Sequence, residues 1–151
     1  MPASLRHPLI LLLLWTLGAA LDRIWLQLDH GMPDWDQADY LTGAMNYWQA
    51  LKQPDWLNQD WWVGLWQLSS KIPPLVYVVT AAVMGLVGTG GDQAMMIHLL
   101  FSAVMILSLY GLGRSLFSPV VGLWAAGLAM AAPGLYPLRH QFLLDYPWRR
   151  W

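Results

Sequence analysis

The stretch Asp34-Trp35-Asp36-Gln37-Ala38-Asp39-Tyr40 has side chains whose types and spacing could support chemistry. It places three carboxylates within six residues, next to aromatic side chains. A carboxylate held in a fixed position can act as a general base or as a metal ligand. The same pattern fits a helix start, with Asp34 as the N-cap and Gln37 at the third helical position. Spacing alone leaves helix capping, ordinary loop acidity and catalysis as alternatives.

The composition limits what kind of protein carries this stretch. Of 151 residues, 57% are hydrophobic and 11% are charged, whereas soluble domains carry about 25% charged residues. The sequence therefore predicts an all-α integral membrane protein. The net charge of −1 gives no basis for binding nucleic acid. Cysteine is absent, which excludes disulfides and thiolate metal sites.

Four apolar runs flank the polar stretch. The first, residues 1–28, carries Arg6 near its start and is predicted as an uncleaved transmembrane helix with a cytoplasmic N-terminus, because cytoplasmic flanks are rich in cations. The second is weakened by glycines, and its helical part, residues 73–87, rises only about 23 Å. That is short of the hydrocarbon core of about 30 Å. The third and fourth runs, residues 93–113 and 115–138, are long enough to cross.

Residues 29–71 are predicted to form an outer loop. Apolar residues recur at helical spacing from Tyr40 onward, which predicts a helix from Asp34 to Lys52. A second helix is predicted to start at Asp55–Trp56, with Trp56, Trp61, Leu65 and Leu68 on one side. Both segments are amphipathic and rich in tryptophan, so we expect two interfacial helices.

The charge of this loop indicates its side of the membrane. Between Asp29 and Asp60 there are six aspartates and one cation, Lys52. Cations, and not acids, are enriched in cytoplasmic loops, so an acidic loop is expected on the outer side.

Polar side chains inside the apolar runs need a separate explanation. We interpret Asp22 and Arg23 as a local charge pair near the outer end of the first run, although contacts with other helices stay open. His98 is interpreted as hydrogen-bonded to a neighbouring helix and not as a ligand. Several methionines are interpreted as gap-filling residues and not as a metal-binding series: Met84, Met95, Met96, Met105 and Met130.

Four short motifs occur in a fixed order along the chain. They are Asp36-Gln37-Ala38-Asp39-Tyr40, Lys71-Ile72-Pro73-Pro74-Leu75-Val76-Tyr77, Leu112-Gly113-Arg114-Ser115-Leu116-Phe117 and Leu144-Asp145-Tyr146-Pro147. Their order resembles the N-terminal part of the C-type membrane glycosyltransferases that use lipid-phosphosugar donors. The branch that matches is glycosyltransferase family 39, the protein mannosyltransferase and aminoarabinose transferase relatives. The resemblance covers nearly all of this chain but only the first part of such an enzyme, so we expect a fragment.

The resemblance assigns roles to individual residues. Asp36 would be the catalytic base that takes a proton from the acceptor, and Asp145 would be a second catalytic acid facing the same pocket. Lys71 would lie near the donor phosphate, where a cation offsets its charge. Further residues would bind substrate: Asp39, Tyr40 and Arg139.

Two positions depart from the family pattern. Many relatives have a second acid directly after the first, where this chain has Gln37. Some relatives have an acid before the lysine that takes part in metal binding, where this chain has Ser70. A divalent metal therefore has little support, and we assign neither a metal ligand nor a cofactor.

The resemblance also constrains the topology, because Asp36 and Asp145 must lie on the same side of the membrane. Four crossings would place them on opposite sides. If the segment 72–88 enters without crossing, three crossings remain and both aspartates face outward. Arg114 is then cytoplasmic, as the positive-inside rule expects, whereas Arg139 lies outside, against that rule. We predict three crossings, with four as the alternative.

The sequence thus predicts a partial C-type glycosyltransferase fold with three to four transmembrane helices and an outer loop of two interfacial helices. Its parts are residues 1–28, 29–71 and 72–151. The predicted function is transfer of a sugar from a polyprenyl-phosphate-linked donor to an unidentified acceptor outside the plasma (inner) membrane, with the fragment inactive alone. The alternatives are a small non-catalytic membrane protein that binds a partner or lipid through its Trp-rich loop, and a transporter fragment.

Overall fold

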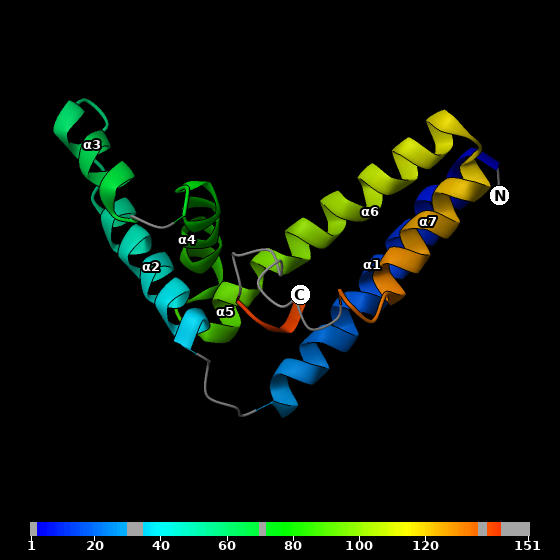
Figure 1. Ribbon diagram of the computed structural model, residues 1–151, viewed down its shortest axis with the longest axis horizontal. Coiled ribbons are helices and arrows are strands. Elements are labelled where there is room, and N and C mark those ends of the chain that lie inside the picture. The colour runs from blue at the N-terminus through cyan, green and yellow to red at the C-terminus, as the bar shows by residue number, and fades with distance from the viewer. Residues whose placement is uncertain (1–2, 30–34, 70–71, 136–138, 143–151) are drawn as a thin grey trace. The chain divides into compact units, whose positions relative to one another are not determined.

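The computed structural model describes residues 3–29, 35–69, 72–135 and 139–142. In these residues all regular secondary structure is helical, as predicted (Figure 1). The chain forms two compact units, residues 1–31 with 98–140 and residues 32–97 with 141–151, and each is described by itself. The helices are α1 (Ala3–Leu28), α2 (Trp35–Lys52), α3 (Gln59–Gln67), α4 (Leu75–Val87), α5 (Gly91–Met95), α6 (Ile97–Leu116) and α7 (Pro119–Ala131).

Two helical stretches in the described part of the chain are long and apolar enough to cross a membrane. They are Arg6–Leu28 in α1 and Gly91–Leu116, which joins α5 to α6. Large apolar side chains are exposed along α1, α6 and α7, among them Leu13, Leu107 and Leu128. Lipid is a suitable environment for such surfaces, because hydrocarbon contacts them without the penalty that water imposes.

The fourth apolar run forms a shorter helix than its length in sequence predicts. The run spans residues 115–138, but α7 has 13 residues and rises only about 20 Å. Ser118 caps a new helix by accepting a hydrogen bond from the Val121 N–H, and Pro119 occupies the first turn. At the other end, Ala132 is extended before Pro133, because proline disfavours helical backbone in the residue before it. The run is therefore long enough to cross, but the helix that it forms is shorter than the run.

Within the first unit, α6 runs antiparallel to α1 and α7 runs parallel to it. Trp15 of α1 donates its indole N–H to the Leu99 carbonyl at 3.0 Å and lies 3.2 Å from Ser102 Oγ, near the start of α6. Near the other end of α6, the Tyr110 ring lies 6.2 Å from that of His7. The parallel pair shows in Figure 1 as the blue and orange helices. Its register is set by Leu14 against Gly127 and Gly18 against Met130.

A close approach of two glycines joins α6 to α7. A Cβ atom on Gly113 would lie 2.5 Å from the Gly122 Cα, and a Cβ on Gly122 would lie 2.5 Å from the Tyr110 carbonyl oxygen. Small residues let helix backbones approach this closely, and in membranes such packing replaces the hydrophobic driving force. Around this contact the core of the unit is formed by Leu11, Ile106 and Ala126, with Met105 and Met130 filling gaps as predicted.

The second unit is built on two interlocking stripes. Tyr40, Ala44 and Tyr47 repeat every three or four residues on α2, and they pack in a core with the matching series Tyr77, Ala81 and Met84 of α4. The Tyr47 and Tyr77 rings stack with their centroids 5.2 Å apart. The predicted helix over residues 34–52 and its apolar face are confirmed for residues 35–52.

The second loop helix begins later than predicted. Asn58 is the N-cap of α3, because its side chain accepts a hydrogen bond from the Asp60 N–H at 2.9 Å. Asp55 lies in the turn before it, where its carbonyl accepts from the Asn58 N–H. Trp61, Leu65 and the C-cap Leu68 keep the spacing of one helix side, whereas Trp56 precedes α3, so the predicted common side does not extend to Trp56.

The two glycines near the end of α6 should respond oppositely to the same substitution. Gly113→Ala should lower the free energy of unfolding by about 1–3 kcal/mol, because the new methyl group overlaps the α7 backbone. Gly111→Ala is the control, because its Cβ would meet nothing within 4 Å. Helix propensity then predicts that the free energy of unfolding rises by up to about 1 kcal/mol. Unfolding in detergent micelles measures both. Equal effects would contradict the close glycine contact.

Candidate functional site

In the first turns of α2, the side chains of the predicted acidic stretch lie on two faces of the helix, one exposed and one buried. Asp36 and Asp39 are three residues apart, so they share a helix face, and both are exposed. Gln37 and Tyr40 form the opposite pair and are buried, with Tyr40 only 3% exposed in the core of the second unit. Asp36 lies in the first turn, where the partial positive charge of the helix N-terminus favours a carboxylate.

Three of the predicted site residues lie outside the described residues: Asp34, Lys71 and Asp145. Their predicted roles as helix cap, phosphate ligand and second acid therefore stay predictions. Arg139 is described, and it lies in the first unit in a polar cluster that sequence reasoning did not foresee.

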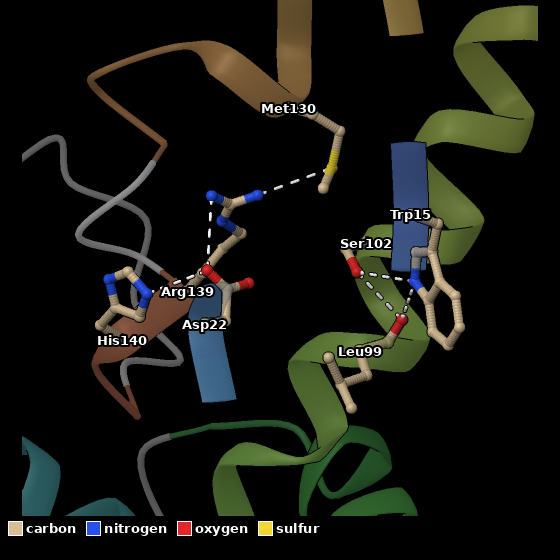
Figure 2. Close-up of polar contacts among 7 residues, drawn as sticks. All are labelled: Trp15, Asp22, Leu99, Ser102, Met130, Arg139 and His140. Atoms are coloured by element: carbon tan, nitrogen blue, oxygen red, sulfur yellow. Dashed lines mark hydrogen bonds and ion pairs between the residues drawn. The ribbon is translucent and has the colours of Figure 1, made fainter. Parts of the chain in front are cut away.

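This cluster consists of Asp22, Arg139 and His140 (Figure 2). Trp25 lies beside them. Asp22 Oδ1 lies 2.9 Å from His140 Nε2 and 3.5 Å from an Arg139 guanidinium nitrogen. The Trp25 ring stacks on the His140 ring, with centroids 4.2 Å apart. Arg139 also points its second terminal nitrogen at the Met130 sulfur, 3.6 Å away. One face of α1 thus holds the short segment that follows α7.

Burial makes this cluster energetically demanding. Asp22 is 6% exposed and His140 is 4% exposed. An ionised carboxylate in such a place costs several kcal/mol unless cations and N–H donors offset the lost hydration. Removing one partner of a buried pair typically costs about 3–5 kcal/mol, because the other charge is left uncompensated. The interpretation of Asp22 as half of a local pair with Arg23 is therefore wrong, since Asp22 pairs with residues more than a hundred positions away.

The environment of His140 opposes its protonation. Burial lowers the pKa of His140, and the Asp22 carboxylate counteracts this by favouring the charged ring. The Arg139 cation lowers the pKa further, and Asp29 raises it. The neutral ring is therefore favoured, and its Nε2–H can donate to Asp22.

The arrangement places a guanidinium and an imidazole beside a buried carboxylate. A guanidinium can bind an anion, and an imidazole can exchange a proton. Among the residues that the structure describes, no group of three or more acidic or histidine side chains gathers in a way that could hold a metal ion.

The comparison with known proteins bears on this site directly. The family of the dolichyl-phosphate-mannose-protein mannosyltransferases matches residues 71–149, just over half of the chain. The chain belongs to this family. The resemblance drawn from the four motifs is thereby confirmed, and membership makes the chain a membrane protein related to glycosyltransferases that use a lipid-linked sugar donor. No curated protein and no solved structure matches the chain.

The family match includes only part of the cluster. Arg139 and His140 lie within the matched residues, as do Lys71 and Asp145, whereas Asp22 and Asp36 precede them. Sequence reasoning missed Asp22, Trp25 and His140 as a connected group. The available signal was a carboxylate within an apolar run, because ionisable residues in membrane helices usually have a partner and a function.

The lowered pKa of His140 predicts a loss of stability in acid. The folded state resists the proton that an unfolded histidine takes up near about pH 6.5, so stability is full above that pH and falls as the pH drops below it. His140→Gln keeps an N–H donor for Asp22 but does not titrate, so its thermal unfolding midpoint should change less between about pH 7.5 and about pH 5.

His7→Gln is the matched control, because it leaves the cluster intact, and it should retain the acid sensitivity of the unsubstituted chain. Midpoints measured in detergent micelles decide the point. An undiminished acid response in His140→Gln would contradict the assignment of this sensitivity to His140.

Proposed function

We propose that this chain takes part in the transfer of a sugar from a polyprenyl-phosphate-linked donor to an acceptor on the outer side of the plasma (inner) membrane. The observation that carries the proposal is the family match over residues 71–149. The exposed carboxylate of Asp36 supports it, because a base must reach an acceptor that arrives from outside the helical core.

In the proposed reaction, Asp36 accepts the proton of an acceptor hydroxyl as its oxygen attacks the anomeric carbon. The bond between that carbon and the phosphate oxygen breaks, and the polyprenyl phosphate leaves with the electron pair. Attack opposite the leaving group inverts the anomeric configuration. General-base assistance of this kind contributes about 10²–10⁴-fold to a rate.

The remaining site residues are proposed to bind the substrates. Lys71 and Arg139 supply cations for the donor phosphate, where a guanidinium can form two parallel hydrogen bonds. Asp145 is proposed to act as a second acid. Asp39, exposed beside Asp36, is placed to accept hydrogen bonds from sugar hydroxyls. Tyr40 is buried and would act by fixing the position of α2.

The contacts of the first unit support three membrane crossings. Because α6 is antiparallel to α1, its start lies at the same end of that unit as Trp15 and the residues after it. Because α7 is parallel to α1, the chain returns to that end, where Arg139 pairs with Asp22. The polypeptide between α1 and α6 would then begin and end on one side, so α4, with only 13 residues, enters without crossing.

The charges at the two ends of this unit agree with that orientation. Arg6 and His7 lie at the start of α1, and the contact of His7 with Tyr110 brings the end of α6, with Arg114, to the same end. A cytoplasmic N-terminus places these groups inside, as the positive-inside rule expects. Arg139 lies toward the outside, where its pairing with Asp22 reduces the penalty.

The exposed tryptophans of α3 support a position at the membrane interface. Trp56, Trp62 and Trp66 are exposed, and the Trp56, Trp61 and Trp62 rings pack edge-on or tilted at centroid distances of 4.9–5.6 Å. Tryptophan prefers the headgroup region of a bilayer, where its ring is apolar and its N–H is polar. These residues would hold the acidic start of α2 near lipid-linked substrates.

Substitution of Asp36 tests the catalytic assignment. Asp36→Asn should reduce transfer from a radiolabelled polyprenyl-phosphate-linked sugar by about 10²-fold or more, because the amide cannot accept the proton. The assay uses membranes from cells that express the protein from its gene without truncation. Asp55→Asn, at an exposed aspartate before α3, is the control and should retain activity. Full activity of Asp36→Asn would leave Asp36 with helix capping or loop acidity alone.

The absence of cysteine from the sequence permits a direct topology test. Asp92→Cys, at an exposed position in the first turn of α5, should react in intact cells with a membrane-impermeant maleimide. Ser115→Cys, exposed at the other end of α6, should react only after permeabilisation. Protection of position 92 in intact cells would mean that α4 crosses, and the shared site of Asp36 and Asp145 would have to be abandoned.

A further inference from the structure

The face of α1 that meets the Arg139–His140 segment is built from three residues at helical spacing. Gly18, Asp22 and Trp25 follow one another at intervals of four and three, so they share one side of the helix. Gly18 leaves room for the Met130 methyl group, which a Cβ atom would strike, and the same Cβ would lie 3.8 Å from an Arg139 guanidinium nitrogen. Asp22 and Trp25 then bind the two polar side chains, as Figure 2 shows for Asp22.

The two partners of Asp22 are held unequally. The contact with His140 is 2.9 Å, the length of a good hydrogen bond to a charged group, and the ring is also fixed by stacking on Trp25. The contact with Arg139 is 3.5 Å, longer than the roughly 2.7–2.9 Å of a tight charge-assisted bond. Arg139 is therefore the partner that can change ligand at the lower energetic cost. A phosphate suits a guanidinium especially well, because the planar guanidinium can donate two N–H groups to two phosphate oxygens at once.

We propose that Asp22 is a positioning residue for lipid phosphate: it holds Arg139 and His140 together until a phosphodiester anion takes Arg139, and it then keeps His140 as its partner. This inference rests on the proposed function, since it assumes that the donor is a polyprenyl phosphodiester. It adds to that function a residue outside the matched family segment and a mechanism by which this residue acts.

Charge balance gives the exchange a measurable consequence. Among the described residues, the charged groups that act on His140 are Asp22 and Asp29, from α1 and the residue after it, and Arg139 from its own segment. From α7, the uncharged Met130 contacts Arg139. When the phosphate neutralises Arg139, the cation no longer opposes protonation of His140, and the imidazole remains to balance the Asp22 carboxylate. The pKa of His140 then rises, and a proton is taken up. By linkage, the phosphodiester binds more tightly as the pH falls through the range in which His140 titrates.

The experiment uses the full chain in nanodiscs, with ¹³C-labelled histidine and a soluble probe, farnesyl methyl phosphate. As a phosphodiester, this probe keeps one negative charge throughout the pH range of the titration. The four histidines of the chain can be followed by NMR, and the His140 signal is assigned with His140→Gln. Farnesol, which lacks the phosphate, controls for insertion of the lipid tail. The expected result is saturable binding of the phosphodiester, a raised pKa of His140 in the complex, and at least about threefold tighter binding at about pH 5.5 than at about pH 7.5.

Three variants test the positioning role. Asp22→Asn should weaken binding by about tenfold or more and remove its pH dependence, whereas Asp22→Glu, which keeps the charge, should recover most of both. Asp60→Asn, an exposed aspartate of α3, should bind within about twofold of the unsubstituted chain, as expected for surface changes away from a site. Because the pH dependence is measured on the unsubstituted chain, the proposal stays testable even if Asp22→Asn does not fold.

The failures are distinguishable. If the phosphodiester binds but its affinity is independent of pH, or is the same in Asp22→Asn, the positioning role is overturned while the proposed donor class stands. If the unsubstituted chain does not distinguish farnesyl methyl phosphate from farnesol, phosphate recognition is overturned, and the proposed function loses its donor as well.

Discussion

The buried carboxylate of Asp22 is the constraint on which the first unit depends. A negative charge within a largely apolar helix of membrane-spanning length is unfavourable in lipid, and the cation of Arg139 and the N–H of His140 offset it. Because these partners follow α7, the charge draws that helix alongside α1 and fixes its direction. Burial of the Asp22 carboxylate costs free energy, so the ion pair is hard to explain as a source of stability. Its role is better understood as setting the register of α7 against α1, since a buried ion pair specifies a position more strongly than it stabilises a fold.

The helices of the two units pack through different kinds of residue. In the first, glycines bring helix backbones together and the indole N–H of Trp15 links α1 to α6, which suits helices whose other faces are apolar and exposed. In the second, tyrosine and alanine alternate along α2 and fit a tyrosine–alanine–methionine series on α4. Gly43 belongs to this fit, because a Cβ there would lie 2.8 Å from the Tyr77 ring. Aromatic stripes of this kind bury the inward side of α2 and leave Asp36 and Asp39 facing outward.

Local patterns in the sequence determined what was predictable. The α2 helix was predictable because its buried residues repeat at helical spacing, and the family was predictable because four motifs occur in the right order. The start of α3 was misplaced because Asn58, and not Asp55, supplies the cap, and two polar residues three positions apart compete for that role on equal terms. The fourth run was expected to be long enough to cross, but hydropathy does not register the helix start at Ser118–Pro119, and α7 has 13 residues. Asp22 could have been singled out as a carboxylate within an apolar run, but its partners could not be named, since Asp22 and His140 are 118 residues apart and no local period connects them.

The wide separation of Asp22 and His140 along the chain has a consequence for biosynthesis. At ordinary rates of about 5–20 residues per second, the ribosome needs on the order of ten seconds to reach His140 after Asp22 has been made. During that interval Asp22 lacks both of the partners that contact it in the folded unit. Arrival of α7 and the residues after it completes the charge balance. The residues that pair with Asp22 are thus made more than a hundred residues after it.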